Sequence, residues 1–573
     1  MADGAGMTRE LAADVVIVGG GTAGCMAAVA AKEARPDLRV LIVEKAAIDR
    51  SGCLAAGMNA INAYLHPGET PESYTRYARY DACGLVREDL VQSGAALLNE
   101  AVARLEAWGL PIQKDAGGAY ARRGRWNLKI HGEGLKPLLA AAARRAGAEI
   151  AERVAAVDLI VRDGRAVGLF GLGARDGSFY VIRAGAVIIS TGGAAGIYRP
   201  VNPASGAALG WYCPFNAGTG YAMGLRAGAE MTSLEMRFIA LRTKGILCPT
   251  GTLALGFGAR QINARGEEYM RRLAEVGGEG APTCYRIMGP IREIKEGRGP
   301  CYLDTRGLDA LRVKEAKEAF LEMYPGIVLY WTANDLDPGR EPVEITGTEP
   351  YLVGGHCQAG FWVDTERRTT LAGLYAAGDA AGGYPGKFVS GCLAEGIIAG
   401  RAAAAEAQAP PAPDTDLCAA ERERILQPLR LPARAGIDPA PTDFLERLQW
   451  VTEFYAGGAA SFYELNEERL AVARRELERL AERVRDIRAR DCHELIAAHE
   501  AADRLVTARA MVEHLLYRRE TRWPGFQTRL DFPARDDHRW LVFVNSIYDR
   551  DSGRFSIMER PYNQIIPGDR YLP

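Results

Sequence analysis

The chain has 573 residues, of which 48% are hydrophobic, and its formal net charge at pH 7 is −2. This length exceeds what one hydrophobic core supports, so we expect two or three domains. Because the charge is nearly balanced, the composition argues against a nucleic-acid-binding protein. No apolar run approaches the roughly 20 residues of a membrane span, and the N-terminus lacks a signal-peptide pattern, which favours a cytoplasmic location without membrane insertion.

The 11 cysteines are scattered along the chain and include no CxxC pair. This spacing argues against an iron–sulfur or zinc motif, and we expect no metal site in the chain. Without an export signal, most of these cysteines are expected to be small buried residues in a reducing compartment. Iron–sulfur clusters, if the chemistry uses them, would come from another protein.

The segment Val15–Ala31, VVIVGGGTAGCMAAVAA, predicts a buried strand that turns through glycines into a helix. The first two glycines of the GxGxxG spacing allow a tight turn and close approach to a pyrophosphate, and the third allows close helix packing. The helix N-terminus adds free N–H groups and partial positive charge. A second expected strand, VLIVEK, ends about twenty residues further on with an acid suited to an adenosine ribose. The dinucleotide-binding residues predicted here are Gly19, Gly21, Ala23, Gly24, Glu44 and Lys45.

Two later segments show the same change from apolar strand to glycine turn, Ala184–Pro200 and Leu371–Gly383. The last, LAGLYAAGDAAGG followed by KFVSGCLAEG, resembles the terminal flavin-binding motif of large FAD oxidoreductases. In that motif Asp379 would bind the ribityl or pyrophosphate part of FAD; the alternative is that Asp379 caps a helix. Because the three blocks lie far apart, the nucleotide-binding domain must be discontinuous.

We therefore expect an α/β fold: a discontinuous Rossmann-like FAD-binding domain with an inserted α+β capping domain and a C-terminal helical domain. The segment LNEERLAVARRELERLAERVRDIRAR has apolar residues at a spacing of three and four, which is typical of an amphipathic helix. The predicted limits are 1–229 plus 342–407 for the FAD-binding domain, 230–341 for the capping domain, 408–416 for a Pro-rich linker and 417–573 for the C-terminal domain.

Together the three blocks resemble the succinate dehydrogenase and fumarate reductase flavoprotein superfamily. Members that bind FAD covalently carry a histidine directly after an Arg-Ser pair, whereas this chain has Gly52, so we expect non-covalent FAD. The adjacent Cys53 is expected to be a buried structural cysteine. Cys248 and Lys387 stand where the superfamily has a histidine and a carboxylate-binding arginine, which weakens the case for a dicarboxylate substrate.

A closer resemblance is to the alpha subunits of the adenylylsulfate reductase family. It is carried by GRWNLKIHGE, GGAAGIYRP, GWYCPFNAGTGYAM, MRFIALRTK, EGRGPCYLDT, TEPYLVGGH and KFVSGCLAEG. The C-terminal segments RETRWPGF, DFPARDDHRW, FVNSIYD and ERPYNQIIP also resemble the terminal domain of that family, which the succinate dehydrogenase branch would not predict.

This resemblance implies roles for individual residues. The implied catalytic residues are Arg242, His356, Glu133 and Asn62, and the implied substrate-binding residues are Trp211, Leu255 and Arg286. The further implied cofactor-binding residues are Ser51, Gly57, Asn59, Thr191, Gly192, Gly378, Asp379, Lys387, Phe388, Ser390 and Glu395.

The implied reaction is the FAD-dependent two-electron reduction of adenosine 5′-phosphosulfate to sulfite and AMP, or its reverse, through a flavin N5-sulfite adduct. Arg242 and His356 would stabilise developing oxyanion charge, and Arg286 would stack on adenine. Electrons would pass through a ferredoxin-like beta subunit with two [4Fe–4S] clusters, which makes the protein part of a hetero-oligomer.

Each role has a structural alternative. Arg242 and Arg286 would otherwise form surface ion pairs, His356 would be a hydrogen-bonded structural residue, Glu133 would cap the following helix and Trp211 would be a core aromatic. Ala254 replaces a bulky aromatic residue of the family, and this leaves open a divergent enzyme of the fumarate reductase type that acts on another small anionic or sulfur-containing substrate. A non-catalytic redox-sensing flavoprotein is the third possibility.

Overall fold

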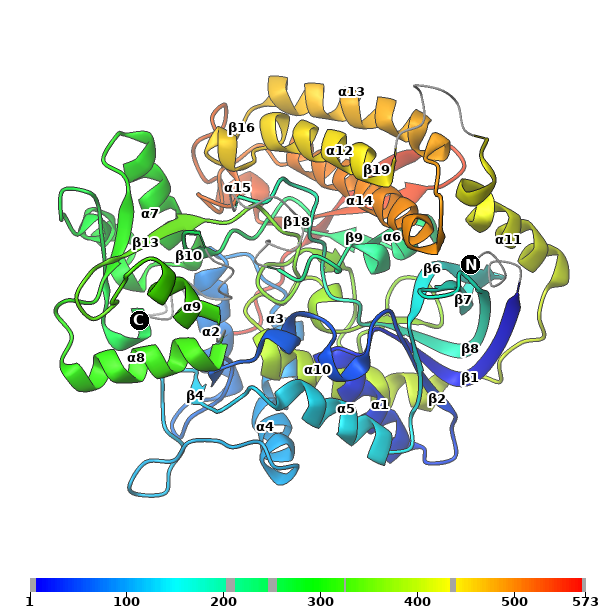
Figure 1. Ribbon diagram of the computed structural model, residues 1–573, viewed down its shortest axis with the longest axis horizontal. Helices are drawn as coiled ribbons and strands as arrows, with labels where there is room; N and C mark the ends of the chain where they lie inside the picture. The colour runs from blue at the N-terminus through cyan, green and yellow to red at the C-terminus, as the bar shows by residue number, and fades with distance from the viewer. Residues whose placement is uncertain (1–6, 202–211, 246–254, 324–325, 433–439, 569–573) are drawn as a thin grey trace.

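The computed structural model describes residues 7–201, 212–245, 255–323, 326–432 and 440–568 (Figure 1). Its largest sheet has seven strands in the order β5-β2-β1-β8-β7-β6, with β15 also paired to β8. The strands are β1 (Thr8–Val18), β2 (Val40–Glu44), β5 (Glu149–Glu152), β6 (Val154–Arg162), β7 (Arg165–Gly173), β8 (Phe179–Ile189) and β15 (Leu374–Ala376). β5, β2, β1, β8 and β15 are parallel, and β6 and β7 form an antiparallel extension.

The strand β1 is buried on both faces, as its unbroken apolar run predicts for a parallel strand. Val15 and Ile17 belong to one hydrophobic cluster, and Val16 and Val18 belong to another on the opposite face. The first cluster is covered by α1 (Thr22–Ala34), α5 (Leu135–Arg145) and α10 (Phe388–Glu406), which lie together below the sheet in Figure 1.

Within the described residues, α10 is the one helix whose length and composition would suit a membrane span. However, 67% of its most apolar 18-residue stretch is buried inside the fold. Its small residues allow close contact with α1. A Cβ on Gly396 would lie 2.4 Å from the Ala23 carbonyl oxygen, and one on Gly400 would lie 2.3 Å from that of Ala27. The composition of α10 is therefore explained by its place in the core.

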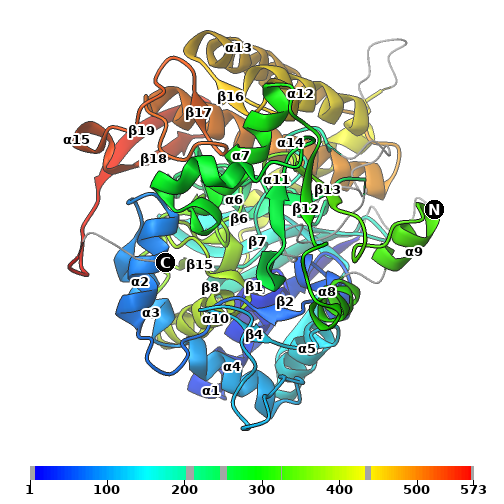
Figure 2. The ribbon, with the colours of Figure 1, turned by 90° about the vertical axis from the view of Figure 1, so that its left-hand side faces the viewer.

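The inserted segment forms a separate antiparallel sheet in the order β10-β13-β12-β11, beside the helices that face the viewer in Figure 2. Its elements are β10 (Leu241–Thr243), β11 (Arg260–Ile262), α7 (Thr283–Lys295), β12 (Cys301–Asp304), α8 (Ala310–Met323), α9 (Gly326–Ala333) and β13 (Val343–Gly347). The strand β13 lies beyond the predicted limit at residue 341 yet pairs with β10 and β12. The domain limits themselves stay predictions.

The C-terminal part of the chain combines helices with an antiparallel strand pair. Its elements are α11 (Thr415–Arg430), α12 (Pro441–Tyr455), β16 (Glu464–Leu465), α13 (Glu467–Arg483), α14 (Cys492–Tyr517), β17 (Thr528–Arg529), α15 (Asp537–Trp540), β18 (Val542–Asp549) and β19 (Arg554–Pro561). The strand β18 pairs with β9 (Met231–Thr232), which in turn pairs with β14 (Gly360–Phe361). The C-terminal part is thus joined to the rest by main-chain hydrogen bonds.

Short polar side chains start the C-terminal helices where the sequence changes from loop to helical pattern. The Asp414 carboxylate accepts a hydrogen bond from the Leu417 N–H at 3.0 Å and starts α11 at the end of the Pro-rich segment. The Asp491 carboxylate accepts from the N–H groups of His493 and Glu494, both at 2.9 Å, and starts α14. Such caps satisfy amide groups that have no partner within the helix.

The remaining elements connect these parts. They are β3 (Ala60–Ile61), α2 (Pro71–Asp81), α3 (Glu88–Ala95), α4 (Leu98–Ala107), β4 (Leu128–Lys129) and α6 (Thr219–Arg226). Short 3-10 helices are η1 (Ile48–Arg50), η2 (Cys53–Ala56), η5 (Tyr269–Val276), η6 (Gly278–Gly280), η7 (Gly378–Ala380), η8 (Ala459–Ser461) and η9 (Val484–Asp486).

Candidate functional site

A cleft lies at the carboxyl ends of the parallel strands β1, β2, β8 and β15, where open α/β sheets bind nucleotides. Four chain segments that are far apart in the sequence meet there. The predicted cofactor residues that line the cleft are Gly19, Gly21, Ala23, Glu44, Lys45, Ser51, Thr191, Gly192, Gly378 and Asp379. The sheet topology therefore brings the three sequence blocks and the Arg-Ser segment to one place.

The glycine turn between β1 and α1 leaves no room for side chains at two positions. Gly19 has a φ of +98°, and a Cβ there would lie 2.6 Å from the Ser190 carbonyl oxygen. A Cβ on Gly24 would lie 2.0 Å from the Gly19 carbonyl oxygen. A Cβ on Gly21, in contrast, would meet only the Ser190 oxygen, at 3.9 Å. Gly19 and Gly24 are thus required by the fold, whereas Gly21 leaves open space toward the cleft.

Glu44 is 7% exposed, and its carboxylate is oriented by two backbone amides. Oε2 accepts from the Gly20 N–H and Oε1 from the Ala46 N–H, both at 2.8 Å. A carboxylate has about four acceptor sites, so it still has capacity for a ribose hydroxyl. Ser51 Oγ is buried without a hydrogen-bond partner among the described residues. A polar cofactor in this cleft would satisfy both groups, so these residues fit a dinucleotide.

Asp379 lies in η7 on the wall of the cleft. The Tyr212 hydroxyl donates to Asp379 Oδ2 at 2.6 Å, and a Cβ on Gly355 would lie only 1.8 Å from Oδ1. The helix that follows, α10, has Lys387 as its N-cap and no side-chain cap. Asp379 therefore does not cap α10, so that alternative is wrong. Tyr212 was missed in the sequence, where only the aromatic segment GWYCPFNAG marks it.

Two predicted cofactor residues, Lys387 and Glu395, turn their side chains into the protein. Lys387 Nζ donates to Glu395 Oε2 at 2.8 Å and to the Ala381 carbonyl at 2.9 Å. Glu395 also accepts from the Gly378 N–H at 2.9 Å and from Arg367 Nε at 3.1 Å. All three charged side chains in this cluster are fully buried. The cluster fixes the Gly378 turn, so these residues act on the cleft through the backbone.

The other cofactor residues predicted near this helix also contact protein atoms. Ser390 donates to the Ala63 carbonyl. Phe388 has a positive φ of 46°, and its ring lies against His356. Gly57, with φ of +88°, closes η2 next to the segment that carries Asn59.

Lys136 is a further positioning residue that the sequence interpretation missed. It is fully buried, and Nζ donates to the Gly20 carbonyl at 2.7 Å and to the Ile48 carbonyl. Burial lowers the pKa of Lys136, with opposing contributions from Cys25 and Glu44. The side chain ties the glycine turn to η1. Its position in HGEGLKP, three residues after Glu133, was the one signal in the sequence.

The segments of Arg242 and His356 run side by side. Arg242 is 2% exposed on β10 and lies opposite Thr346 in β13. The His356 ring packs between Phe238, at a centroid distance of 4.7 Å, and Phe388, at 5.1 Å. Burial lowers the pKa of His356, against a smaller opposing effect of Asp379. The imidazole is therefore neutral at pH 7, and Arg242 is not a surface residue.

The β3 and β4 pair brings GRWNLKIHGE beside GMNAIN. The Gly132 N–H donates to the Met58 carbonyl at 2.9 Å. Asn62 Oδ1 is buried without a hydrogen-bond partner among the described residues. Glu133 is exposed, and the N-cap of α5 is Gly134 with no side-chain cap, so Glu133 does not cap that helix.

Two of the predicted substrate residues, Leu255 and Arg286, lie in different segments of the insertion. The third lies outside the described residues. Arg286 Nη2 on α7 donates to Thr283 Oγ1 at 2.9 Å, whereas Arg286 Nε is buried without a partner in the described structure. Leu255 is half-buried, and its neighbour Gly256 lies beside Arg123. Trp211, like Cys248 and Ala254, lies outside the described residues.

Arg123 connects the Leu255 segment to the predicted cofactor residue Asn59. Its Nη1 donates to Asn59 Oδ1 at 2.9 Å. Burial lowers the pKa of Arg123 to about 10. The sequence interpretation missed this residue, which stands in the Arg-rich run before GRWN.

Cys53 is exposed in the cleft, so the expectation of a buried structural cysteine is wrong. Its Sγ accepts a hydrogen bond from the Cys213 N–H at 3.3 Å. Within the described ranges, no group of three or more His, Cys, Asp or Glu side chains has an arrangement that would hold a metal ion.

Comparisons with known proteins agree with this architecture. Residues 14–391 match the family model "FAD binding domain", and residues 464–567 match "Fumarate reductase flavoprotein C-term". The second match corrects one expectation: the C-terminal segment is shared with fumarate reductase flavoproteins and does not separate the two branches.

Among relatives, the adenylylsulfate reductase subunit alpha of Megalodesulfovibrio gigas is 33% identical, covering 98% of this chain and 97% of the relative. The solved adenylylsulfate reductase of Archaeoglobus fulgidus is 37% identical with a TM-score of 0.92, covering 98% of both chains. A structure of adenosine-5-phosphosulfate reductase, described as a covalent adduct with sulfite, is 37% identical to this chain with a TM-score of 0.93. The E. coli quinol fumarate reductase subunit, at 22% identity and 0.82, shares the fold.

These matches confirm the expected fold class and FAD as the cofactor. The chain belongs to the adenylylsulfate reductase alpha-subunit family, within the FAD-dependent flavoproteins that include fumarate reductase.

Proposed function

We propose that this protein catalyses the FAD-dependent reduction of adenosine 5′-phosphosulfate to sulfite and AMP, or the reverse, AMP-dependent oxidation of sulfite. The observation that carries the proposal is the 37% identity over 98% of both chains to an adenylylsulfate reductase of known structure. When bound, FAD supplies or accepts the two electrons that take sulfur between its sulfate and sulfite oxidation states.

Arg242 is the proposed source of positive charge for this reaction. Its guanidinium stays protonated at any working pH, and it is 2% exposed. Burying an anionic sulfuryl group without a cation costs several kcal/mol, and charge-assisted hydrogen bonds offset that cost. In the proposal Arg242 binds the sulfuryl oxygens and stabilises the charge that develops on them.

His356 is proposed to act as a neutral hydrogen-bonding group. Because burial lowers its pKa, it donates a hydrogen bond from one ring nitrogen and is able to accept a proton at the other. Phe238 and Phe388 hold the ring in place. This division of roles leaves the positive charge to Arg242.

Two buried polar atoms of predicted site residues are candidates to contact a polar ligand. Asn62 Oδ1 is an acceptor and Arg286 Nε a donor, and neither has a hydrogen-bond partner in the part of the chain that the structure describes. Buried polar groups usually have a hydrogen-bond partner, so a ligand or a bound water would satisfy each of these atoms. We assign Asn62 to orienting substrate or flavin and Arg286 to the adenine, with Leu255 and Trp211 as pocket walls and Glu133 at the entrance.

The proposed cofactor mode is non-covalent, because Gly52 stands where covalent members of the superfamily carry the histidine. Ser51, Glu44 and the N-terminus of α1 would hold the polar parts of FAD. Lys387 and Glu395 would act indirectly, through the Gly378 turn.

We also propose a ferredoxin-like beta subunit with two [4Fe–4S] clusters, and thus a hetero-oligomer in the cytoplasm. The support is that the M. gigas relative is named a subunit alpha and that the sequence has no CxxC motif. Co-purification of a small brown subunit with about eight iron atoms, as two [4Fe–4S] clusters require, would agree with the proposal. Full activity of the lone chain with a physiological donor would contradict it.

The reaction is tested by anaerobic ferricyanide reduction with sulfite, with and without AMP, since this acceptor replaces the partner. AMP-dependent turnover is the expected result. Turnover with fumarate and reduced dye but none with sulfite plus AMP, in a protein with full flavin content, would replace the proposal by a fumarate-reductase-type activity.

A further inference from the structure

Two cysteines that the proposed chemistry does not use meet between the FAD-binding part and the inserted segment. Cys83 Sγ and Cys284 Sγ lie 3.5 Å apart. Cys83 follows α2, and Cys284 is in the first turn of α7. Their side chains are 5% and 1% exposed. The contact joins positions 201 residues apart in the sequence, so the tertiary fold creates it.

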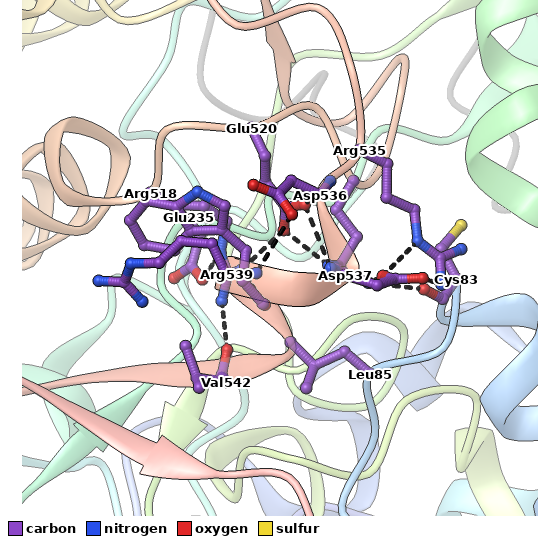
Figure 3. A network of polar contacts seen from close by, with 12 residues as sticks. Cys83, Leu85, Glu235, Arg518, Glu520, Arg535, Asp536, Asp537, Arg539 and Val542 are labelled. Atoms are coloured by element: carbon purple, nitrogen blue, oxygen red, sulfur yellow. Dashed lines mark hydrogen bonds and ion pairs between the residues drawn. The ribbon is translucent and has the colours of Figure 1, made fainter.

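The backbone on the α2 side of the pair is anchored. The Trp523 indole N–H donates to the Ala82 carbonyl at 2.9 Å, and Arg522 Nη1 donates to the Cys83 carbonyl at 3.1 Å. Figure 3 shows Cys83 at the edge of this polar network, next to Arg535 and Asp537. Cys83 itself has a positive φ of 53°, which a non-glycine residue keeps only where its surroundings impose it.

The α7 side is anchored to the same turn. Thr283 donates to Asp81 Oδ1 from its backbone N–H at 2.8 Å and from its hydroxyl at 2.9 Å. A Cβ on Gly525 would lie 2.7 Å from the Cys284 carbonyl oxygen, so the backbone at Gly525 packs directly on the cysteine. The two thiols are therefore held in contact by hydrogen bonds and packing that do not involve the sulfur atoms.

We propose that Cys83 and Cys284 form an oxidation site, at which peroxide converts the thiol pair into a disulfide between the α2 turn and α7. The sulfur atoms have to approach from 3.5 Å to the roughly 2.05 Å of an S–S bond.

The step balances with hydrogen peroxide as the oxidant. One thiolate attacks a peroxide oxygen, the O–O bond breaks, and a sulfenic acid and water form. The second sulfur then displaces the sulfenic oxygen as water and forms the S–S bond. Overall the two thiols lose two electrons and two protons, and peroxide leaves as two water molecules. Burial raises the pKa of the Cys284 thiol well above its ordinary value, which favours Cys284 as the second sulfur.

A bulk thiol count would not identify this bridge, because Cys53 and Cys213 are also in contact. Peptide mapping separates the two pairs. Trypsin releases Cys83 in residues 80–87 and Cys284 in residues 273–286, each as the only cysteine of its peptide. Neither Cys53 nor Cys213 lies in these peptides.

The test treats the native holoenzyme with hydrogen peroxide, blocks free thiols with N-ethylmaleimide and maps the tryptic peptides without reductant. The expected product is a cross-linked 80–87/273–286 species, two hydrogen masses lighter than the sum of its parts and lost on reduction. Recovery of both peptides only as blocked thiols, or as sulfenic and sulfinic products without the cross-link, overturns the proposal, provided that circular dichroism shows folded protein.

Variants sharpen the result. Cys284→Ser removes the cross-linked species, and the matched variant Cys418→Ser, in the half-buried part of α11, retains it. Loss of the 80–87/273–286 species in Cys418→Ser as well as in Cys284→Ser would overturn the assignment. The wild-type map needs no variant, so it decides the matter even where Cys284→Ser does not fold.

Discussion

Alanine at Gly24 and at Gly21 should have different effects, because the two positions face different surroundings. At Gly24 the added methyl lies 2.0 Å from the Gly19 carbonyl oxygen and 2.6 Å from Ser190 Oγ. Overpacking of this kind costs about 1–3 kcal/mol, and a clash with backbone belongs at the upper end. A loss of about 3 kcal/mol in the free energy of unfolding lowers the Tm of a domain of about 150–250 residues by roughly 6–12 °C.

At Gly21 the methyl meets only the Ser190 carbonyl oxygen, at 3.9 Å, and points to open space. Gly21 is the N-cap of α1, where alanine costs about 1 kcal/mol or less. The fold should therefore tolerate the change. The loss of one charge-assisted hydrogen bond between backbone and phosphate is worth about 1.5–3 kcal/mol, which weakens FAD binding about 10–100-fold.

Melting curves of the apoproteins and flavin-fluorescence titrations with FAD measure the two effects separately. We expect Gly24→Ala to melt much earlier than wild type, and Gly21→Ala to melt within about 4 °C of wild type but bind FAD weakly. Wild-type FAD affinity in Gly21→Ala would refute the close approach of phosphate to this turn. Wild-type melting of Gly24→Ala would refute the packing argument.

Four further outcomes are expected. Arg242→Ala should lower kcat/KM for AMP-dependent sulfite oxidation by about 10²–10³ with flavin content unchanged, while Arg242→Lys keeps part of it; full activity of the alanine variant would contradict its role. Acid precipitation should release all flavin into the supernatant, because Gly52 provides no attachment point; colour that stays with the precipitate would disprove non-covalent binding. Lys387→Met should lower the free energy of unfolding in denaturant by about 3–5 kcal/mol, because it leaves the buried Glu395 short of one partner, and a loss below about 1 kcal/mol would speak against that reasoning. Burial lowers the pKa of His499 to about 4, so the unfolded chain takes up this proton first; stability is retained above about pH 6.5 and should fall by up to about 3 kcal/mol toward pH 4, a slope that urea midpoints should show in wild type but not in His499→Gln.

The sequence by itself determined the cofactor half of the molecule. The spacing of Gly19, Gly21 and Gly24 can be recognised in the sequence because Gly19 has a positive φ, Gly24 makes a contact too close for a Cβ, and Gly21 leaves open space toward the cleft. The unbroken apolar strands and the discontinuity of the blocks likewise followed from residue types that act over a few positions. The family followed from segments spread over the whole chain.

Only the tertiary structure decided which charged residues face the cleft and which turn away from it. The sequence predicted Lys387 and Glu395 to bind the cofactor. In the structure they join Arg367 in a buried cluster that holds the Gly378 turn. Lys136 lies 116 residues from the glycine whose carbonyl it binds, and its position in HGEGLKP did not reveal that contact.

Cysteine environments show the same limit. Cys53 was expected to be buried but is exposed to the cleft, and the contact of Cys83 with Cys284 spans 201 residues. Backbone conformation and hydrophobic period are set by neighbours in the chain, so a sequence displays them. The partner of a buried charge or thiol is set by how distant segments pack, and that information exists only once the chain has folded.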